Sequence, residues 1–215
     1  MSTAEKLTAI AENQQRVYDA GYAKGKADGI DYDKFWDNFQ GGDGRVSYCY
    51  AFSYNRFTDE TYNPKYNIVC SSGSTTSNYM FYNSDLITDT KVPIDATGSS
   101  SLQRTFANAT ALETIRSLTV KESHTFDSAF SGCTALKNIT IAGTIGKSIS
   151  FNSSPLTPAS MKSVISCLKD YSGTSDADTQ TLTFTSACWT ALEADSTAPD
   201  GGTWKQYVQN KGWKV

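Results

Sequence analysis

Phe106-Ala-Asn-Ala-Thr-Ala-Leu112 and Phe130-Ser-Gly-Cys-Thr-Ala-Leu136 are nearly the same heptapeptide, and 24 positions separate them. In each stretch an aromatic residue stands six positions before a leucine. A period in the twenties is typical of a solenoid, in which one coil cannot bury its own apolar face and neighbouring coils stack to form a continuous core. The pair therefore predicts a repeat solenoid rather than the core of a globular enzyme.

Two further stretches extend the repeat. Met80-Phe-Tyr-Asn-Ser-Asp-Leu86 precedes the pair and Ser150-Phe-Asn-Ser-Ser-Pro-Leu156 follows it, so the leucines are spaced by 26, 24 and 20 positions. Strand-like segments come after three of these leucines, and Leu136-Lys-Asn-Ile-Thr-Ile141 alternates so that its apolar side chains point into a coil. We expect an α/β-type repeat solenoid: a short, irregular, leucine-rich-repeat-like stack of coils with a parallel β-sheet.

The residues at the head of each copy have predicted packing roles. Met80, Phe106 and Phe130 fill the convex side of a coil, and the Asn, Gly or Ser that follows makes the turn. Cys133 stands where the preceding copy has Ala109, so we expect it to fill a small slot in the core. The five cysteines include no CxxC pair, which favours small buried side chains over a zinc site or a catalytic thiol.

Residues 1–40 are predicted to form a helical anchor or oligomerisation segment. Leu7, Ile10, Gln14 and Val17 follow a 3-4-3 spacing, which makes a short apolar seam with one polar layer. A seam of two turns does not hold an isolated helix in water. The segment therefore either self-associates, with a trimer as one arrangement, or docks on a larger assembly.

Glycines recur at intervals of four after this seam, at Gly21, Gly25 and Gly29. On a helix they would leave a stripe without side chains, along which a partner backbone could approach closely. The alternative, which we favour, is a flexible break between the anchor and the aromatic residues that follow.

The chain divides into the anchor, a Gly-rich linker, the repeat domain and a C-terminal capping region: 1–40, 41–47, 48–156 and 157–215. In the cap, Thr157-Pro158 starts a helix that we expect to end near Gly173. A strand over 181–184, a short helix over 188–194, a last helix ended by Gly212 and a terminal strand over 213–215 should close the stack.

The composition disfavours several classes of partner and chemistry. Charged residues make up 19% of the chain and the net charge is -3, so we expect no nucleic-acid or membrane partner. The single histidine, His124, is predicted in a turn or at an outward strand position, and Asp59-Glu60 and Asp176-Ala-Asp178 as solvated acids. We therefore expect no catalytic residue, no metal site and no cofactor.

The repeat stretches of the chain resemble those of the BspA-type leucine-rich-repeat proteins. The resemblance rests on Met80-Phe81, Phe106-Ala-Asn108 and the run from Phe130 to Ile141, and it covers about residues 48–185. The stretch from Ala4 to Gly21, the segment Lys34-Phe-Trp-Asp37 and the C-terminal Gly212-Trp213 are similar to the ends of virion-associated proteins from bacteriophages of gut bacteria. In such proteins the repeat domain is taken to bind the host surface, and the family pattern carries no catalytic residue.

The resemblance implies a non-enzymatic virion appendage on the tail or the head, anchored to other virion proteins by its N-terminal helix and adhering to a bacterial surface glycan or protein. A purely structural decoration protein and a bacterial surface adhesin are the alternatives. The first thirty residues hold no apolar stretch, so we expect no signal peptide and synthesis in the host cytoplasm.

Binding surfaces are enriched in tyrosine, because its ring gives a large contact area and its hydroxyl forms hydrogen bonds. The expected ligand surface comprises Tyr48, Tyr50, Tyr54, Tyr62, Tyr66 and Tyr82.

Overall fold

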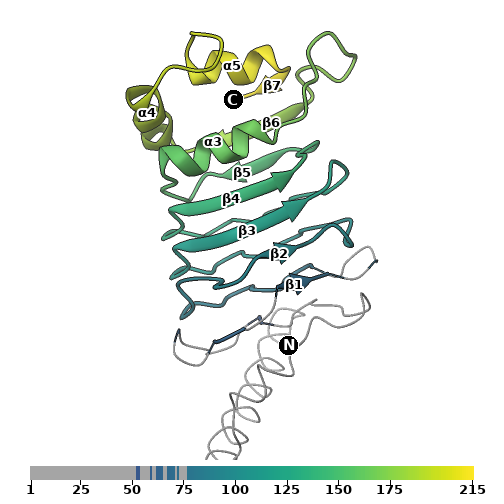
Figure 1. The fold of residues 1–215 in the computed structure, drawn as a ribbon, viewed down its shortest axis with the longest axis vertical. Coiled ribbons are helices and arrows are strands. Elements are labelled where there is room, and N and C mark those ends of the chain that lie inside the picture. Colours follow the sequence, from purple (N-terminus) through teal and green to yellow (C-terminus); the bar gives the residue numbers. More distant parts are fainter. Residues whose placement is uncertain (1–51, 54–58, 60–61, 65–66, 71, 73–76) are drawn as a thin grey trace, which may run out of the picture.

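The computed structural model describes residues 52–53, 59, 62–64, 67–70, 72 and 77–215. This part of the chain is a mixed α/β fold with parallel sheets and three helices, which confirms the prediction at the level of fold class (Figure 1). The predicted anchor, 1–40, and linker, 41–47, lie outside the described residues, and so do the anchor residues Leu7, Ile10, Gln14, Val17, Gly21 and Gly25.

A four-stranded parallel sheet has its strands in the same order in space as in the sequence. They are β1 (Ile68–Val69), β2 (Ile94–Asp95), β3 (Thr114–Val120) and β4 (Asn138–Gly143). The register places Ile68, Ile94, Leu118 and Ile141 side by side, and all four are buried. The alternation seen in the sequence therefore produces one continuous apolar row, to which each turn of the chain contributes one residue.

A ladder of phenylalanine rings runs through the core. The rings of Phe81, Phe106 and Phe130 are nearly parallel, with 9° and 8° between their planes and centroids 5.4 and 5.5 Å apart. Phe52 extends the ladder at one end, and Phe151 and Phe184 extend it at the other. Offset stacking adds about 0.5–1.5 kcal/mol per pair to the energy of burial. We call the segment from one ladder phenylalanine to the next a coil.

The ladder corrects the alignment of the first copy by one position. Phe81, not Met80, stacks on Phe106, and Ile87 occupies the place of the later leucines. Ile87 is 1% exposed, whereas Leu86, which the sequence alignment placed inside, is 41% exposed. Met80 is also buried, so the apolar pattern fits either register, and the stacking of the rings decides between them.

A small residue stands three positions after each central ladder phenylalanine: Ser84, Ala109, Cys133 and Ser154. Cys133 is fully buried, and its thiol donates to the Phe106 carbonyl oxygen one coil earlier, with Sγ and O 3.0 Å apart. The Ser154 hydroxyl donates in the same way to the Cys133 carbonyl oxygen over 3.1 Å. The predicted small core slot is confirmed, and its polar hydrogens are paired.

A helix covers the outer edge of β4, where the next strand would otherwise pair. In α3 (Pro158–Ser166), the Ser160 and Ser163 hydroxyl oxygens accept hydrogen bonds from the backbone N–H groups of Ile139 and Ile141, each over 2.9 Å. Unpaired edge groups invite association with other chains. The helix thus closes this edge with side-chain oxygens in place of backbone ones.

The C-terminal region forms a second parallel sheet and two more helices at the top of Figure 1. The sheet contains β5 (Ile149–Phe151), β6 (Gln180–Phe184) and β7 (Trp213–Lys214), and the helices are α4 (Ser186–Asp195) and α5 (Trp204–Asn210). A threonine caps the N-terminus of each helix, at Thr157, Thr185 and Thr203. The Glu193 carboxylate also accepts from the N–H groups of Trp204 and Lys205, joining α4 to the start of α5.

The first cap helix is shorter than predicted. It ends at Ser166 rather than near Gly173, because Leu168 forms a parallel bridge with Ile145. The Lys169 N–H continues this pairing by donating to the Ile145 carbonyl oxygen over 2.9 Å. Pairing with the preceding coil therefore replaces the last predicted helical turns.

Candidate binding surface

The structure separates the predicted tyrosine surface into two environments. Tyr62 is fully buried between the rings of Phe52 and Phe81, and its hydroxyl donates to the Thr90 carbonyl oxygen over 3.2 Å. Burial, followed by the nearby Asp89 carboxylate, raises the pKa of Tyr62 far above its usual value. Its assignment to a ligand surface is wrong, because the ring fills the core of a coil. The other early tyrosines lie outside the described residues: Tyr48, Tyr50, Tyr54 and Tyr66.

Tyr82 is partly exposed and belongs to a cluster with Tyr79 and Arg104. The two tyrosine rings meet at 81° with centroids 5.4 Å apart. The Arg104 guanidinium carbon lies 5.8 Å from the centre of the Tyr79 ring, and its Nη1 donates to the Tyr79 hydroxyl oxygen over 3.3 Å. Sequence analysis missed Arg104, which lies two residues before Phe106, as Tyr79 lies two residues before Phe81.

The backbone under this cluster is in the left-handed region. Tyr79 and Arg104 have φ of 56° and 51°, and Ser128, two residues before the next ladder phenylalanine, has φ of 54°. This conformation costs roughly 1–2 kcal/mol for a residue with a side chain, and it is uncommon for bulky residues. A companion left-handed corner lies two residues after Phe81, Phe106 and Phe130, and its residues tolerate this conformation: Asn83, Asn108 and Gly132.

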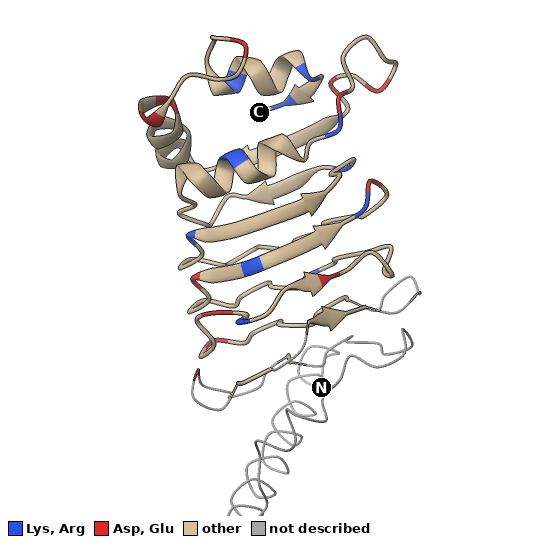
Figure 2. Cartoon of the chain, in the orientation of Figure 1, with Lys and Arg blue, Asp and Glu red and all other residues tan. Residues whose placement is uncertain are grey.

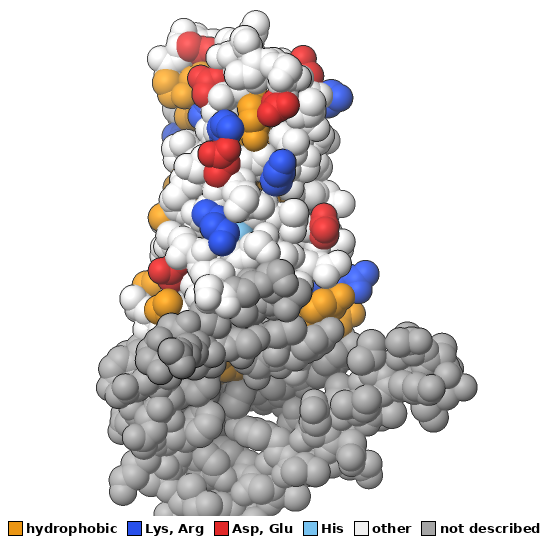
Figure 3. Space-filling view, turned by 90° about the vertical axis from the view of Figure 1, so that its right-hand side faces the viewer, with side chains coloured by type: hydrophobic (Ala, Val, Ile, Leu, Met, Phe, Trp, Pro, Cys, Tyr) orange, Lys and Arg blue, Asp and Glu red, His pale blue; other side chains and the backbone are white. Residues whose placement is uncertain are grey.

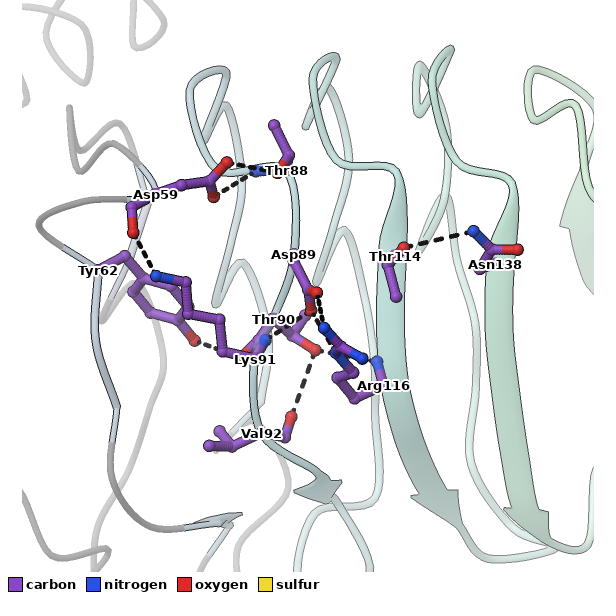
Figure 4. Close-up of polar contacts among 10 residues, drawn as sticks. All are labelled: Asp59, Tyr62, Thr88, Asp89, Thr90, Lys91, Val92, Thr114, Arg116 and Asn138. Atoms are coloured by element: carbon purple, nitrogen blue, oxygen red, sulfur yellow. Dashed lines mark hydrogen bonds and ion pairs between the residues drawn. The ribbon is translucent and has the colours of Figure 1, made fainter.

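The outer face of the parallel sheet is the second candidate surface (Figure 4). Asp89, Thr114 and Asn138 form one row across neighbouring coils, and the Asn138 amide donates to the Thr114 hydroxyl oxygen over 3.4 Å. Arg116 lies in a bulge of β3, where its guanidinium pairs with Asp89 through two nitrogens. The Arg116 side chain is 57% exposed, so the ion pair lies at the surface.

Hydrogen bonds from the first coil reach this face. The Asp59 carboxylate accepts from the backbone N–H and the hydroxyl of Thr88, and the Asp59 carbonyl accepts from the Lys91 ammonium group. Lys91 also donates its backbone N–H to Asp89 over 2.7 Å (Figure 4). These contacts pair Asp59, which the sequence predicted as a solvated acid, and they fix the polar end of the sheet.

Charges are sparse on the strands and gather at the turns (Figure 2). In β4 no residue is charged, and in β3 the one charged side chain is Arg116. The face that lies beyond the strand ends shows both signs, scattered among neutral side chains (Figure 3). This face therefore carries no large field of one sign.

His124 lies in the predicted turn, but its side chain is fully buried rather than outward. Its Nδ1 accepts from the Lys121 backbone N–H over 3.2 Å, and its Nε2 lies 2.7 Å from the Ser99 carbonyl oxygen. The neutral ring with hydrogen on Nε2 satisfies both contacts. Burial lowers the pKa of His124, the Ser99 carbonyl raises it and Lys121 lowers it further.

The buried thiols are poor nucleophiles. Burial raises the pKa of Cys133 to about 12, and burial together with Asp95 raises the pKa of Cys70 to about 12. A thiol with such a pKa stays protonated near neutral pH. Within the described ranges, no group of three or more His, Cys, Asp or Glu side chains is placed to hold a metal ion. No helix in the same ranges is long and apolar enough to cross a membrane.

Comparisons with known proteins give no relative: no family model, no curated protein and no solved structure matches this chain.

Proposed function

We propose that the chain is a non-enzymatic adhesion protein whose repeat domain is a short, capped, leucine-rich-repeat-like solenoid. The spacing of its ladder phenylalanines supports this fold, since 25 positions separate Phe81 from Phe106 and 24 separate Phe106 from Phe130. Each coil adds one parallel strand, and a helix closes the edge at β4. Such scaffolds present extended surfaces for binding.

One observation carries the functional proposal: equivalent inward positions repeat in chemistry, whereas equivalent outward positions do not. Along the ladder every position is phenylalanine. On the sheet face the aligned residues are Asp89, Thr114 and Asn138. Because function resides in sites placed on a fold, a constant core with a varied surface is what a recognition module requires.

The proposed setting is the surface of a bacteriophage virion, on the tail or the head. It rests on the resemblance of the two ends of the chain to virion-associated proteins. Other virion proteins would hold the N-terminal helix, and the repeat domain would bind a bacterial surface glycan or protein. Several copies, as in a homo-oligomer or trimer, would turn weak contacts into firm adhesion through effective concentration.

The test is binding of the fluorescently labelled full chain to intact bacteria, measured by flow cytometry over a panel of gut species. We expect saturable binding to a subset of strains, and loss of it after the surface polysaccharide is removed by periodate. Binding that protease abolishes and periodate spares would assign a protein receptor instead. Absence of binding to every strain would refute adhesion and favour the structural decoration role.

The anchor is tested separately by light scattering on the full chain. Ile10→Asp places a charge in the predicted seam, and Thr8→Asp places it outside as the matched control. If the seam forms an oligomer, the first variant becomes monomeric and the second keeps the mass of the native protein. A monomeric native protein would leave docking on another virion protein as the role of residues 1–40.

A further inference from the structure

The left-handed corner two residues before Phe81, Phe106 and Phe130 differs in its side chains from the companion corner two residues after them. At the companion corner the chain has Asn83, Asn108 and Gly132, which suit the backbone. At the first corner it has Tyr79 and Arg104 in successive coils, then Ser128. Strained positions that bear bulky side chains point to a use for those side chains.

The side chains at this corner make a defined shape. The faces of Tyr79 and Tyr82 stand almost perpendicular, at 81°, and the Arg104 guanidinium borders the Tyr79 ring. A sugar ring packs its apolar C–H face on an aromatic ring, and a planar guanidinium binds a carboxylate through two parallel hydrogen bonds. Both elements stand within one cluster here.

Arg104 keeps donors for a ligand. The ion pairs within the described part of the chain involve Arg116, Lys137, Lys162 and Lys169, and Arg104 takes part in none of them. Among the residues that the structure describes, its one side-chain hydrogen bond goes to the Tyr79 hydroxyl, whereas a guanidinium has five N–H groups. The exposed carboxylates that flank the cluster in sequence, Asp85 and Asp127, form no ion pair with it.

We infer that the cluster of Tyr79, Tyr82 and Arg104 is a subsite for an acidic saccharide. In this subsite a sugar ring packs against tyrosine, and the sugar carboxylate accepts two hydrogen bonds from the Arg104 guanidinium. The inference rests on the proposed adhesion to bacterial surfaces and specifies its ligand as a carboxylate-bearing glycan.

Arg104→Asn is the decisive variant, and Ser128→Asn is its matched control at the same corner one coil later. Asparagine suits the left-handed backbone, so both variants should fold, with a thermal midpoint equal to the native one or about 2–4 °C higher. The probe is an array of acidic and neutral bacterial capsular polysaccharides, in which every acidic polymer is also present after chemical reduction of its carboxylates.

We expect the native chain to bind acidic polymers and to lose about 10-fold or more in affinity after carboxylate reduction or Arg104→Asn, with Ser128→Asn unchanged, because hydrogen bonds to charged groups are lost. Arg104→Lys keeps the positive charge but lacks the planar group that donates two parallel hydrogen bonds to a carboxylate, so the affinity of this variant should be intermediate. If the native chain binds bacteria while reduction or Arg104→Asn has no effect, the subsite is wrong and adhesion stands. If the native chain binds neither bacteria nor any polymer, the proposed function fails and the subsite with it.

Discussion

Gly143 and Gly173 offer a matched pair of substitutions that tests how closely the coils approach. Both have positive φ, 91° and 69°. A Cβ atom at position 143 would lie 1.9 Å from the carbonyl oxygen of Val120, whereas a Cβ atom at position 173 would meet no atom within 4 Å. Gly173→Ala therefore measures the conformational cost alone, and Gly143→Ala adds the contact between β4 and β3.

The two costs differ in size. For Gly173→Ala we expect the free energy of unfolding to fall by about 1–2 kcal/mol, the penalty of the left-handed conformation. At Gly143 the new Cβ and the Val120 oxygen must also move apart by about 1 Å or more to reach ordinary contact. Val120 and Gly143 are the last paired residues of β3 and β4, so this movement weakens backbone hydrogen bonds worth about 1 kcal/mol each. The expected total is about 3–5 kcal/mol.

Urea unfolding followed by tryptophan fluorescence gives both values, since Trp189, Trp204 and Trp213 are buried in the cap. Equal destabilisation by the two substitutions would show that the approach of β4 to β3 has no cost. A loss smaller than 1 kcal/mol for Gly143→Ala would refute the register of these strands as well.

Three further outcomes are expected. Burial lowers the pKa of His124, so the unfolded chain takes up a proton at this histidine more readily than the folded chain. The free energy of unfolding should therefore be unaffected by this group above about pH 6.5 and should fall as the pH drops below that value. His124→Gln should remove this slope in urea unfolding between about pH 7.5 and 5. Ser160→Ala leaves the buried Ile139 N–H unpaired and should cost about 1–3 kcal/mol, whereas the exposed control Ser166→Ala should cost less than about 0.5 kcal/mol by the same measurement. Phe106→Ala removes the central ring of the ladder and should cost about 3–5 kcal/mol in denaturant unfolding.

Local sequence rules predicted the parts of the fold that depend on local chemistry. Thr157-Pro158 starts a helix because the hydroxyl caps it and proline fits its first turn. Cys133, which the sequence aligns with Ala109, is buried as that alignment predicts. The end of the same helix depended on pairing between Leu168 and Ile145 in the preceding coil, which no local signal indicates.

For a related reason, the sequence pattern did not predict the register of the first coil. Leu86 and Ile87 are adjacent and both apolar, so periodicity alone does not say which one points inward. The stacking of Phe81 on Phe106 settles it. Only in this register do Tyr79 and Arg104 occupy equivalent positions, each two residues before a ladder phenylalanine.

The density of tyrosines likewise indicated a candidate surface, but it did not indicate which side chains point outward. Tyr62 points into the core, whereas Tyr79 and Tyr82 stay partly exposed. His124 shows the same limit, because its turn was predicted but its burial depends on hydrogen bonds to Ser99 and Lys121. The Ser99 carbonyl oxygen that holds the His124 ring lies 25 positions earlier in the chain, beyond the reach of local sequence rules.

The proposed subsite and the scaffold are separable because the backbone at the corner is satisfied without the side chains. The N–H groups of Tyr79 and Arg104 donate to the carbonyl oxygens of Gln103 and Asp127 in the next coil, each over 3.0 Å. The ladder phenylalanines lie inside and do not depend on what the corner bears. Substitution at the corner therefore leaves the stack intact and alters the surface alone. A corner optimised for stability would have asparagine or glycine, as its companion has, so the strain at Tyr79 and Arg104 is the cost that binding would explain.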